Sequence, residues 1–113
     1  MDLFDSHCHL NARAFANDRA DILAKCHQLG LSGLCIPSTT ASEWESLLSQ
    51  ARGSSQQRNA HKVRQYVALG LHPCFLSPPY QEIGQKEKRC HELEKLDQLI
   101  GQKSTELVAL GET

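Results

Sequence analysis

The sequence lacks an excess of charge of either sign. It has 12 lysine and arginine residues against 13 aspartate and glutamate residues, which leaves a net charge of -1 at neutral pH. Proteins that follow the phosphates of a nucleic acid over many nucleotides rely on a strong positive field. The composition therefore gives no support to extended electrostatic tracking along DNA or RNA, and any phosphate chemistry needs a metal ion to supply the positive charge.

Several other signatures are missing as well. The five cysteines include no C-x-x-C pair, which favours reduced thiols over a disulfide framework. The glycines form neither G-x-G-x-x-G nor a P-loop, so nucleotide cradling has no support. No apolar stretch approaches the ~18 residues that a membrane span requires, and the first residues lack the basic and then apolar pattern of a signal peptide. We expect a cytoplasmic protein with no membrane association.

What the sequence does contain is an alternation of short apolar runs and helical patterns. Apolar runs that indicate strands occupy residues 1–5, 33–38, 66–69 and 106–113. Helical spacing of apolar residues predicts helices that begin near residues 18, 42 and 82. Strands separated in this way pair in parallel through right-handed crossovers, so the pattern predicts an α/β fold.

Each predicted helix has one apolar stripe and recognisable ends. The expected buried residues are Ile22, Leu23, Cys26 and Leu29 in the first helix, Trp44, Leu47, Leu48 and Ala51 in the second, and Cys90, Leu93, Leu96 and Ile100 in the third. Asp18 is the predicted N-cap of the first helix and Gly30 its stop. The S-x-x-E spacing of Ser42 and Glu45 predicts a capping box, and Gly101 is the expected end of the third helix.

A polar segment follows each predicted strand. These segments read DSHCHL, PSTT, GLHP and GET in chain order. In a parallel sheet the carboxyl ends of the strands lie along one edge, where functional residues gather. We therefore expect residues from the four segments to meet at a common site.

The first of these segments contains an H-x-H pair. Residues i and i+2 of an extended segment project to the same side, so His7 and His9 are placed to present both imidazoles to one point while Cys8 points away. These ligands suit zinc or another divalent transition ion, and a carboxylate widens the choice toward manganese or magnesium. Asp5 is placed to accept a hydrogen bond from an imidazole N–H. Taken alone, the pair fits two surface histidines of a loop equally well.

Two further residues stand at equivalent exits. Glu112 follows the fourth strand, where a carboxylate is able to bridge two ions, although most carboxylates at strand ends are simply solvated. His72 follows the third strand. Considered alone, His72 is better explained as a loop histidine fixed by Pro73 than as a site residue.

Three motifs together make the chain resemble the TatD family of metal-dependent deoxyribonucleases. They are DSHCHL near the start, GLHP after the third strand and LVALGE after the fourth, in matching order and spacing. The resemblance runs over essentially all 113 residues and corresponds to the amino-terminal part of a family member. It implies a TIM-type (β/α) barrel of the metallo-dependent hydrolase kind. A complete barrel takes about 250 residues, so we expect residues 1–113 to form a truncated first part, with about four strands and three helices.

The resemblance also implies roles for individual residues. His7 and His9 resemble the first metal ligands, Glu112 the carboxylate that bridges two divalent ions (Mg, Zn or Mn), and His72 a histidine near the substrate. The implied reaction is metal-assisted hydrolysis of phosphodiester bonds, at a DNA end. The family supplies further ligands and its general base later in the sequence. We therefore assign no catalytic acid or base, and expect the chain alone to be inactive.

Two other interpretations stay open. A related metal hydrolase that acts on C–N or ester bonds shares the barrel and the H-x-H pair. A non-catalytic metal-binding fragment is the other interpretation, with a structural zinc site built from His7, Cys8, His9, Cys74 and Cys90. Structural zinc sites prefer short C-x-x-C or H-x-x-x-H spacings, and the sequence has neither.

Overall fold

The computed structural model of the chain describes residues 2–56, 63–75 and 83–111. The strands are β1 (Leu3–Asp5), β2 (Leu31–Pro37), β3 (Arg64–Leu69) and β4 (Leu107–Leu110). The α-helices are α1 (Arg19–Gln28), α2 (Trp44–Gln56) and α3 (Ile83–Gly101), and short 3-10 helices are η1 (Arg13–Phe15), η2 (Ala41–Glu43) and η3 (Pro73–Phe75). Within these described residues, no helix has the length and apolar character needed to cross a membrane.

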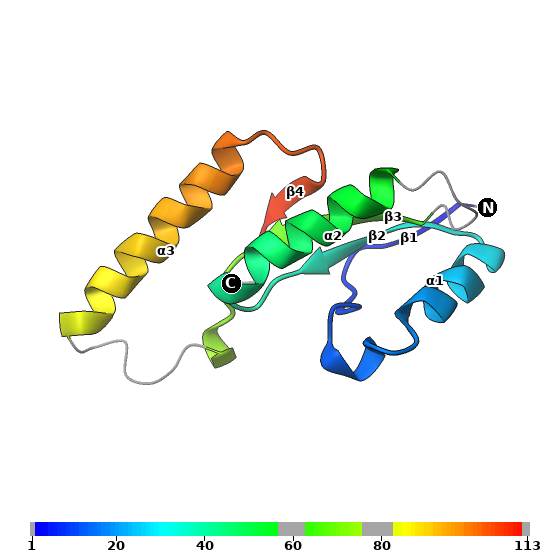
Figure 1. Ribbon diagram of the computed structural model, residues 1–113, viewed down its shortest axis with the longest axis horizontal. Coiled ribbons are helices and arrows are strands. Elements are labelled where there is room, and N and C mark those ends of the chain that lie inside the picture. Colours follow the sequence, from blue (N-terminus) through cyan, green and yellow to red (C-terminus); the bar gives the residue numbers. More distant parts are fainter. Residues whose placement is uncertain (1, 57–62, 76–82, 112–113) are drawn as a thin grey trace.

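The four strands form one parallel sheet in the order β1-β2-β3-β4. A helix connects each strand to the next, and α2 lies along β2 and β3 with α1 and α3 on either side of it (Figure 1). This is the repeating β/α unit of a TIM-type barrel, present here with four strands. The α/β fold predicted from the sequence is confirmed.

The core lies between the sheet and α2. Its residues with almost no exposed surface include Leu34, Ile36, Trp44, Leu47, Leu48, Ala51, Val67 and Leu69. All four residues of the predicted α2 stripe are among them, because helical spacing placed them on the face that meets the sheet. Trp44 is completely buried and is the largest of the group.

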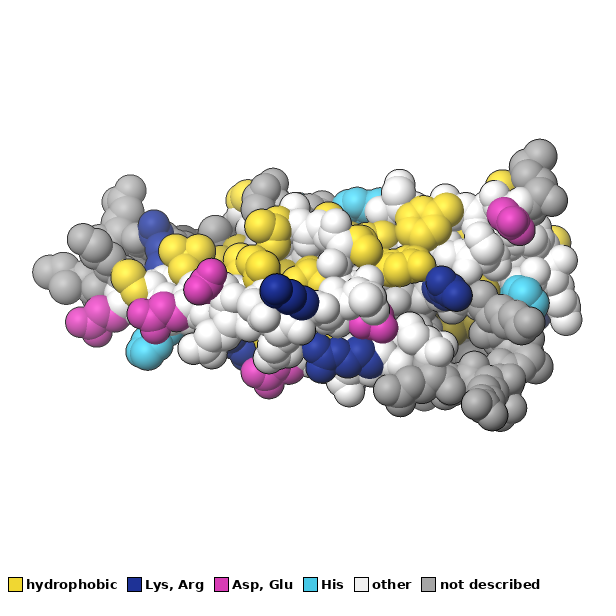
Figure 2. All heavy atoms as spheres, turned by 90° about the horizontal axis from the view of Figure 1, so that it is seen from above, with side chains coloured by type: hydrophobic (Ala, Val, Ile, Leu, Met, Phe, Trp, Pro, Cys, Tyr) yellow, Lys and Arg dark blue, Asp and Glu magenta, His cyan; other side chains and the backbone are white. Residues whose placement is uncertain are grey.

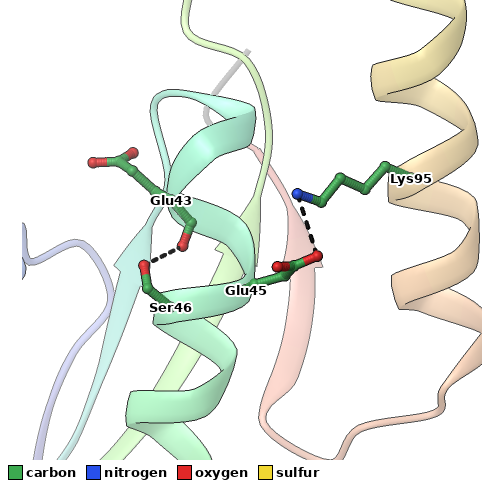
Figure 3. Close-up of polar contacts among 4 residues, drawn as sticks. All are labelled: Glu43, Glu45, Ser46 and Lys95. Carbon is green, nitrogen blue, oxygen red and sulfur yellow. Dashed lines mark hydrogen bonds and ion pairs between the residues drawn. The ribbon is translucent and has the colours of Figure 1, made fainter.

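The start of α2 differs from the prediction. The chain enters through η2, and the capping-box spacing is that of Thr40 and Glu43, two residues before Ser42 and Glu45. Glu43 Oε2 accepts a hydrogen bond from the Thr40 N–H at 3.2 Å. Glu45 Oε1 forms an ion pair with Lys95 of α3 at 3.3 Å (Figure 3). Thr40 and Ser42 each precede a glutamate by three positions, so the sequence pattern fitted both pairs equally.

The ends of α1 agree with the prediction only in part. Gly30 has φ of 95°, a left-handed conformation that ends the helix as predicted. Asp18 occupies the N-cap position, but its side chain makes no capping hydrogen bond. Leu29 was expected to be buried and is 79% exposed. It follows the last helical residue, where helical spacing no longer sets the direction of a side chain.

The buried side of α3 is a second correction. Of the predicted stripe, Cys90 is exposed, and Leu93 and Ile100 are 60% and 41% exposed. Leu96 does contact the core, and Leu99, which was not predicted, is only 6% exposed. The apolar residues of α3 occupy two adjacent stripes, and only packing against the rest of the molecule decides which one is covered.

Both outer strands of the described sheet carry exposed apolar residues. Leu3 and Phe4 of β1 are 45% and 54% exposed, and Val108 and Leu110 of β4 are 53% and 64% exposed. Figure 2 shows hydrophobic side chains in a broken band along one face of the molecule. Outer strands of this kind tend to pair with other chains, which leads to association.

We expect lysine at positions 108 and 110 to reduce self-association of the chain, because charge on an edge strand opposes strand pairing. Sedimentation velocity over a range of protein concentrations measures the effect on the V108K and L110K variants. Leu29→Lys is the matched control, since Leu29 is at least as exposed but lies outside the sheet. An equal reduction in the control would show that general hydrophobicity, and not the β4 edge, drives association.

Candidate metal centre

The segments that follow the strands are held side by side by backbone hydrogen bonds. These bonds run from the Cys8 N–H to Cys35 O (3.0 Å), from Ser38 N–H to Ala68 O (2.8 Å), from His72 N–H to Thr39 O (2.9 Å) and from Gly111 N–H to Leu69 O (2.8 Å). Parallel pairing therefore continues past the strand ends. The strand exits lie along one edge of the sheet, as the sequence predicts.

The two histidines of the H-x-H pair converge at the exit of β1. Their Nε2 atoms are 3.2 Å apart, and the rings lie edge to face with centroids 5.0 Å apart. Cys8, between them, packs against the hydrophobic core, and its N–H bonds to Cys35 O. That bond fixes the backbone so that His7 and His9 share the opposite side. The convergence expected from their spacing is present, although β1 itself ends at Asp5.

The spacing of the two nitrogens suits a shared metal ion. Two imidazoles that bind one tetrahedral zinc ion at about 2.0–2.1 Å have their nitrogens roughly 3.3 Å apart, close to the 3.2 Å between these Nε2 atoms. His7 is exposed and His9 half-buried, so an ion has access. Among the residues that the structure describes, no three His, Cys, Asp or Glu side chains gather around one point. The pair is thus suited to supply two ligands to an ion that requires further ligands from other residues.

The side chain of Asp5 bonds to the backbone of this exit. Its Oδ1 accepts a hydrogen bond from the His7 N–H at 3.1 Å. This bond acts on the main chain that carries the ring, and the predicted bond from an imidazole N–H to Asp5 stays a prediction. Asp5 is therefore placed to orient the loop that presents both imidazoles.

His72 presents a ring whose proton position follows from its hydrogen bonding. The Cys74 N–H donates to His72 Nδ1 at 3.1 Å. Because Nδ1 acts as an acceptor, the proton of the neutral ring lies on Nε2, which is then a donor. The ring lies edge to face with Phe75, with centroids 5.5 Å apart. These contacts suit His72 to donating a hydrogen bond to a substrate oxygen better than to binding a metal through Nε2.

Glu112 lies outside the residues that the structure describes, so its role as a bridging carboxylate stays a prediction. The described chain ends with Gly111, whose N–H donates to Leu69 O. The exit of β4 is therefore in register with that of β3 up to the residue before Glu112.

A buried polar cluster behind the exits was not predicted. Ser38 is completely buried, and its Oγ accepts hydrogen bonds from Trp44 Nε1 (3.0 Å) and from the Gly70 N–H (2.8 Å). Its hydroxyl donates to Gly70 O at 3.2 Å. The segment PSTT marked the exit of β2, but no local pattern indicated a partner as far away as Gly70. Ser38 joins the exits of β2 and β3 to the first turn of α2.

Within the described part of the chain, the thiols do not gather with other ligands into an alternative metal site. All five cysteines are free, and Cys74 and Cys90 are exposed. Burial raises the pKa of the Cys8 thiol, and the nearby Asp5 carboxylate raises it further. Burial also raises the pKa of Cys35. Both thiols are therefore protonated at neutral pH when no metal ion is bound.

Comparison with known proteins identifies the family. Residues 4–113 match the sequence model of a family described as TatD related DNase. The chain belongs to this family. As a TatD protein, it carries its H-x-H pair, its GLHP segment and its LVALGE segment within the matched residues.

Individual TatD relatives match over nearly the whole chain. The Escherichia coli K12 protein YjjV, described as an uncharacterized metal-dependent hydrolase, is 29% identical over 108 residues, which are 96% of this chain and 35% of YjjV. Mouse TATDN3, named as a candidate deoxyribonuclease, is 29% identical over 115 residues, covering 99% of this chain and 35% of TATDN3. The YjjV crystal structure matches with a TM-score of 0.71 and 28% identity, over 97% of this chain and 36% of that one. The chain thus spans about a third of the length of these relatives.

Proposed function

We propose that this chain forms the amino-terminal part of a metal-dependent phosphodiesterase site that acts on DNA. The observation that carries the proposal is the pair of Nε2 atoms of His7 and His9, 3.2 Å apart at the exit of β1. The match to the TatD related DNase family and the name of TATDN3 support DNA as the substrate. The name of YjjV supports hydrolysis that depends on a metal.

Each residue at the edge has a separate part in this proposal. His7 and His9 would hold a divalent ion, and Glu112 would supply a carboxylate ligand for a centre of two ions. His72 donates from Nε2 to a phosphate oxygen, since its Nδ1 already accepts from the Cys74 N–H. Divalent ions bound here would polarise the phosphate and lower the pKa of a bound water.

The charge of the chain favours a short contact with DNA. A net charge of -1 gives no field for holding a long stretch of phosphates, so attraction is local to the metal. The resemblance to TatD deoxyribonucleases implies cleavage at a DNA end, and we propose that reaction here. This chain spans about a third of its relatives' length, and we propose that ligands elsewhere in a full-length protein complete the site.

The test compares the 113-residue chain with a full-length protein that contains the same residues. We expect the full-length protein to degrade end-labelled DNA in the presence of Mg, Mn or Zn. Addition of EDTA should stop the degradation. The chain alone should bind metal weakly and turn over little or no DNA, because it contributes only part of the ligand set. Activity that survives EDTA, or rapid turnover by the chain alone, would contradict the proposal. Assays on small amides and carboxylic esters test for C–N or ester hydrolysis instead.

A further inference from the structure

One carboxylate bonds to the exits of two different strands. Glu43, the last residue of η2, accepts at Oε2 from the Thr39 N–H (2.9 Å), the Thr39 hydroxyl (3.0 Å) and the Thr40 N–H (3.2 Å). Its Oε1 accepts from Asn11 Nδ2 at 3.2 Å. Asn11 stands two residues after His9, in the segment that follows β1. A single side chain therefore joins the exit of β1 to the exit of β2.

The same carboxylate acts on a third exit through Thr39. The carbonyl oxygen of Thr39 accepts from the His72 N–H at 2.9 Å, while its N–H and hydroxyl are held by Glu43. Figure 3 shows the Glu43 carboxylate directed away from the ion pair between Glu45 and Lys95. Glu43 and Glu45 thus face opposite sides of the start of α2.

Capping of the helix explains only a part of this arrangement. A capping glutamate needs one bond, to the N–H of the N-cap residue, which here is Thr40. The other three bonds reach Asn11 and Thr39, which a cap does not require. Hydrogen bonds to a charged carboxylate are about twice as strong as neutral ones, and Glu43 is half-buried, so solvent competes less.

The segment that Glu43 contacts at Asn11 also belongs to the loop of the histidine pair. The Ala12 N–H donates to His9 O at 2.9 Å, which closes a turn around Asn11. On the other side, Arg19 Nε donates to Leu10 O at 2.8 Å. The loop after His9 is therefore held by Arg19 at its carbonyl groups and by Glu43 at the Asn11 amide.

We propose that Glu43 is a positioning residue of the metal site, which sets where the His7 and His9 imidazoles lie relative to His72. It acts through Asn11 and Thr39 and touches neither the ion nor the substrate. This inference rests on the proposed function, because it concerns the same pair of imidazoles. Removing its charge keeps all three histidine side chains but loosens the two loops that carry them, so the positions of the imidazoles change.

The experiment compares three variants of the 113-residue chain. Glu43→Gln keeps the shape of the side chain and removes its charge and one acceptor oxygen. Glu45→Gln makes the same change two positions later, where the partner is Lys95 of α3. Val63→Ala opens a cavity next to the amino end of β3, at a site that is 3% exposed and remote from the exits.

Binding of Co²⁺ is followed by NMR of histidine ring nitrogens in labelled chain, and stability by thermal unfolding. We expect Glu43→Gln to weaken Co²⁺ binding by about 10-fold or more, the range seen when groups that orient metal ligands are removed, with altered shifts of the His7 and His9 rings. Glu45→Gln should keep the wild-type affinity. Val63→Ala should lower the unfolding temperature and leave affinity and ring shifts unchanged.

Three outcomes would overturn the positioning role. If Glu43→Gln binds Co²⁺ as the wild type does, while His7→Ala abolishes binding, Glu43 has no such role and the proposed function stands. If Val63→Ala weakens binding as much as Glu43→Gln, affinity merely follows stability and the role is again excluded. If binding by the wild type does not depend on His7 and His9, the proposed function fails, and the positioning role fails with it.

Discussion

Replacing His7 and His9 together with alanine is expected to abolish metal binding by this chain. Their Nε2 atoms converge to 3.2 Å at the exit of β1. In a full-length TatD protein that carries this segment, the same double variant should reduce metal-dependent DNA hydrolysis to background. Isothermal titration with Zn²⁺ or Mn²⁺ measures the first effect, and release of labelled nucleotides the second.

The single variants His7→Ala and His9→Ala, and variants of two histidines elsewhere, complete this experiment. Each single variant should already lose most of the affinity, because one imidazole cannot chelate. His27→Ala and His91→Ala are the controls: His27 lies on α1, and His91 lies on α3 beside Glu94. Both controls should bind metal as the wild type does. Full affinity in the double variant would exclude His7 and His9 as ligands.

Trp44→Ala is expected to have the largest effect on stability. Trp44 is completely buried, and truncation of a buried tryptophan costs about 3–5 kcal/mol. The change also removes the Nε1 donor from Ser38 Oγ and Gly70 O, at 3.0 and 3.1 Å. Small domains have a free energy of unfolding of only about 5–15 kcal/mol. We therefore expect the variant to lose most of its stability or to be largely unfolded. Urea unfolding followed by circular dichroism provides the measurement.

Two further variants separate packing from hydrogen bonding at this site. Trp44→Phe keeps most of the apolar volume and loses the Nε1 donor, so it should cost about 1–3 kcal/mol. Leu93→Ala, at a site that is 60% exposed, should change stability by about 0.5 kcal/mol or less. A Trp44→Ala variant no less stable than Leu93→Ala would mean that Trp44 does not anchor the core.

The local sequence was enough to determine much of this protein's secondary structure and the position of its strand exits. Apolar runs placed the four strands, and helical spacing placed the buried stripe of α2 from Trp44 to Ala51. The left-handed Gly30 ended α1 where its sequence position indicated. The His7 and His9 rings converge because residues two apart project to one side, which needs no information from the rest of the chain.

Only the tertiary structure decided which side chains connect these parts. Ser38 bonds to Gly70, and Glu43 to Asn11, each across 32 positions of sequence. It also selected Leu99 over Ile100 as the covered residue of α3. Such contacts depend on which groups meet when the sheet and helices pack. The spacing of residues along the chain does not show which groups those are. The sequence by itself thus determined the strand exits and their histidines, and packing determined how Glu43 and Ser38 hold those exits together.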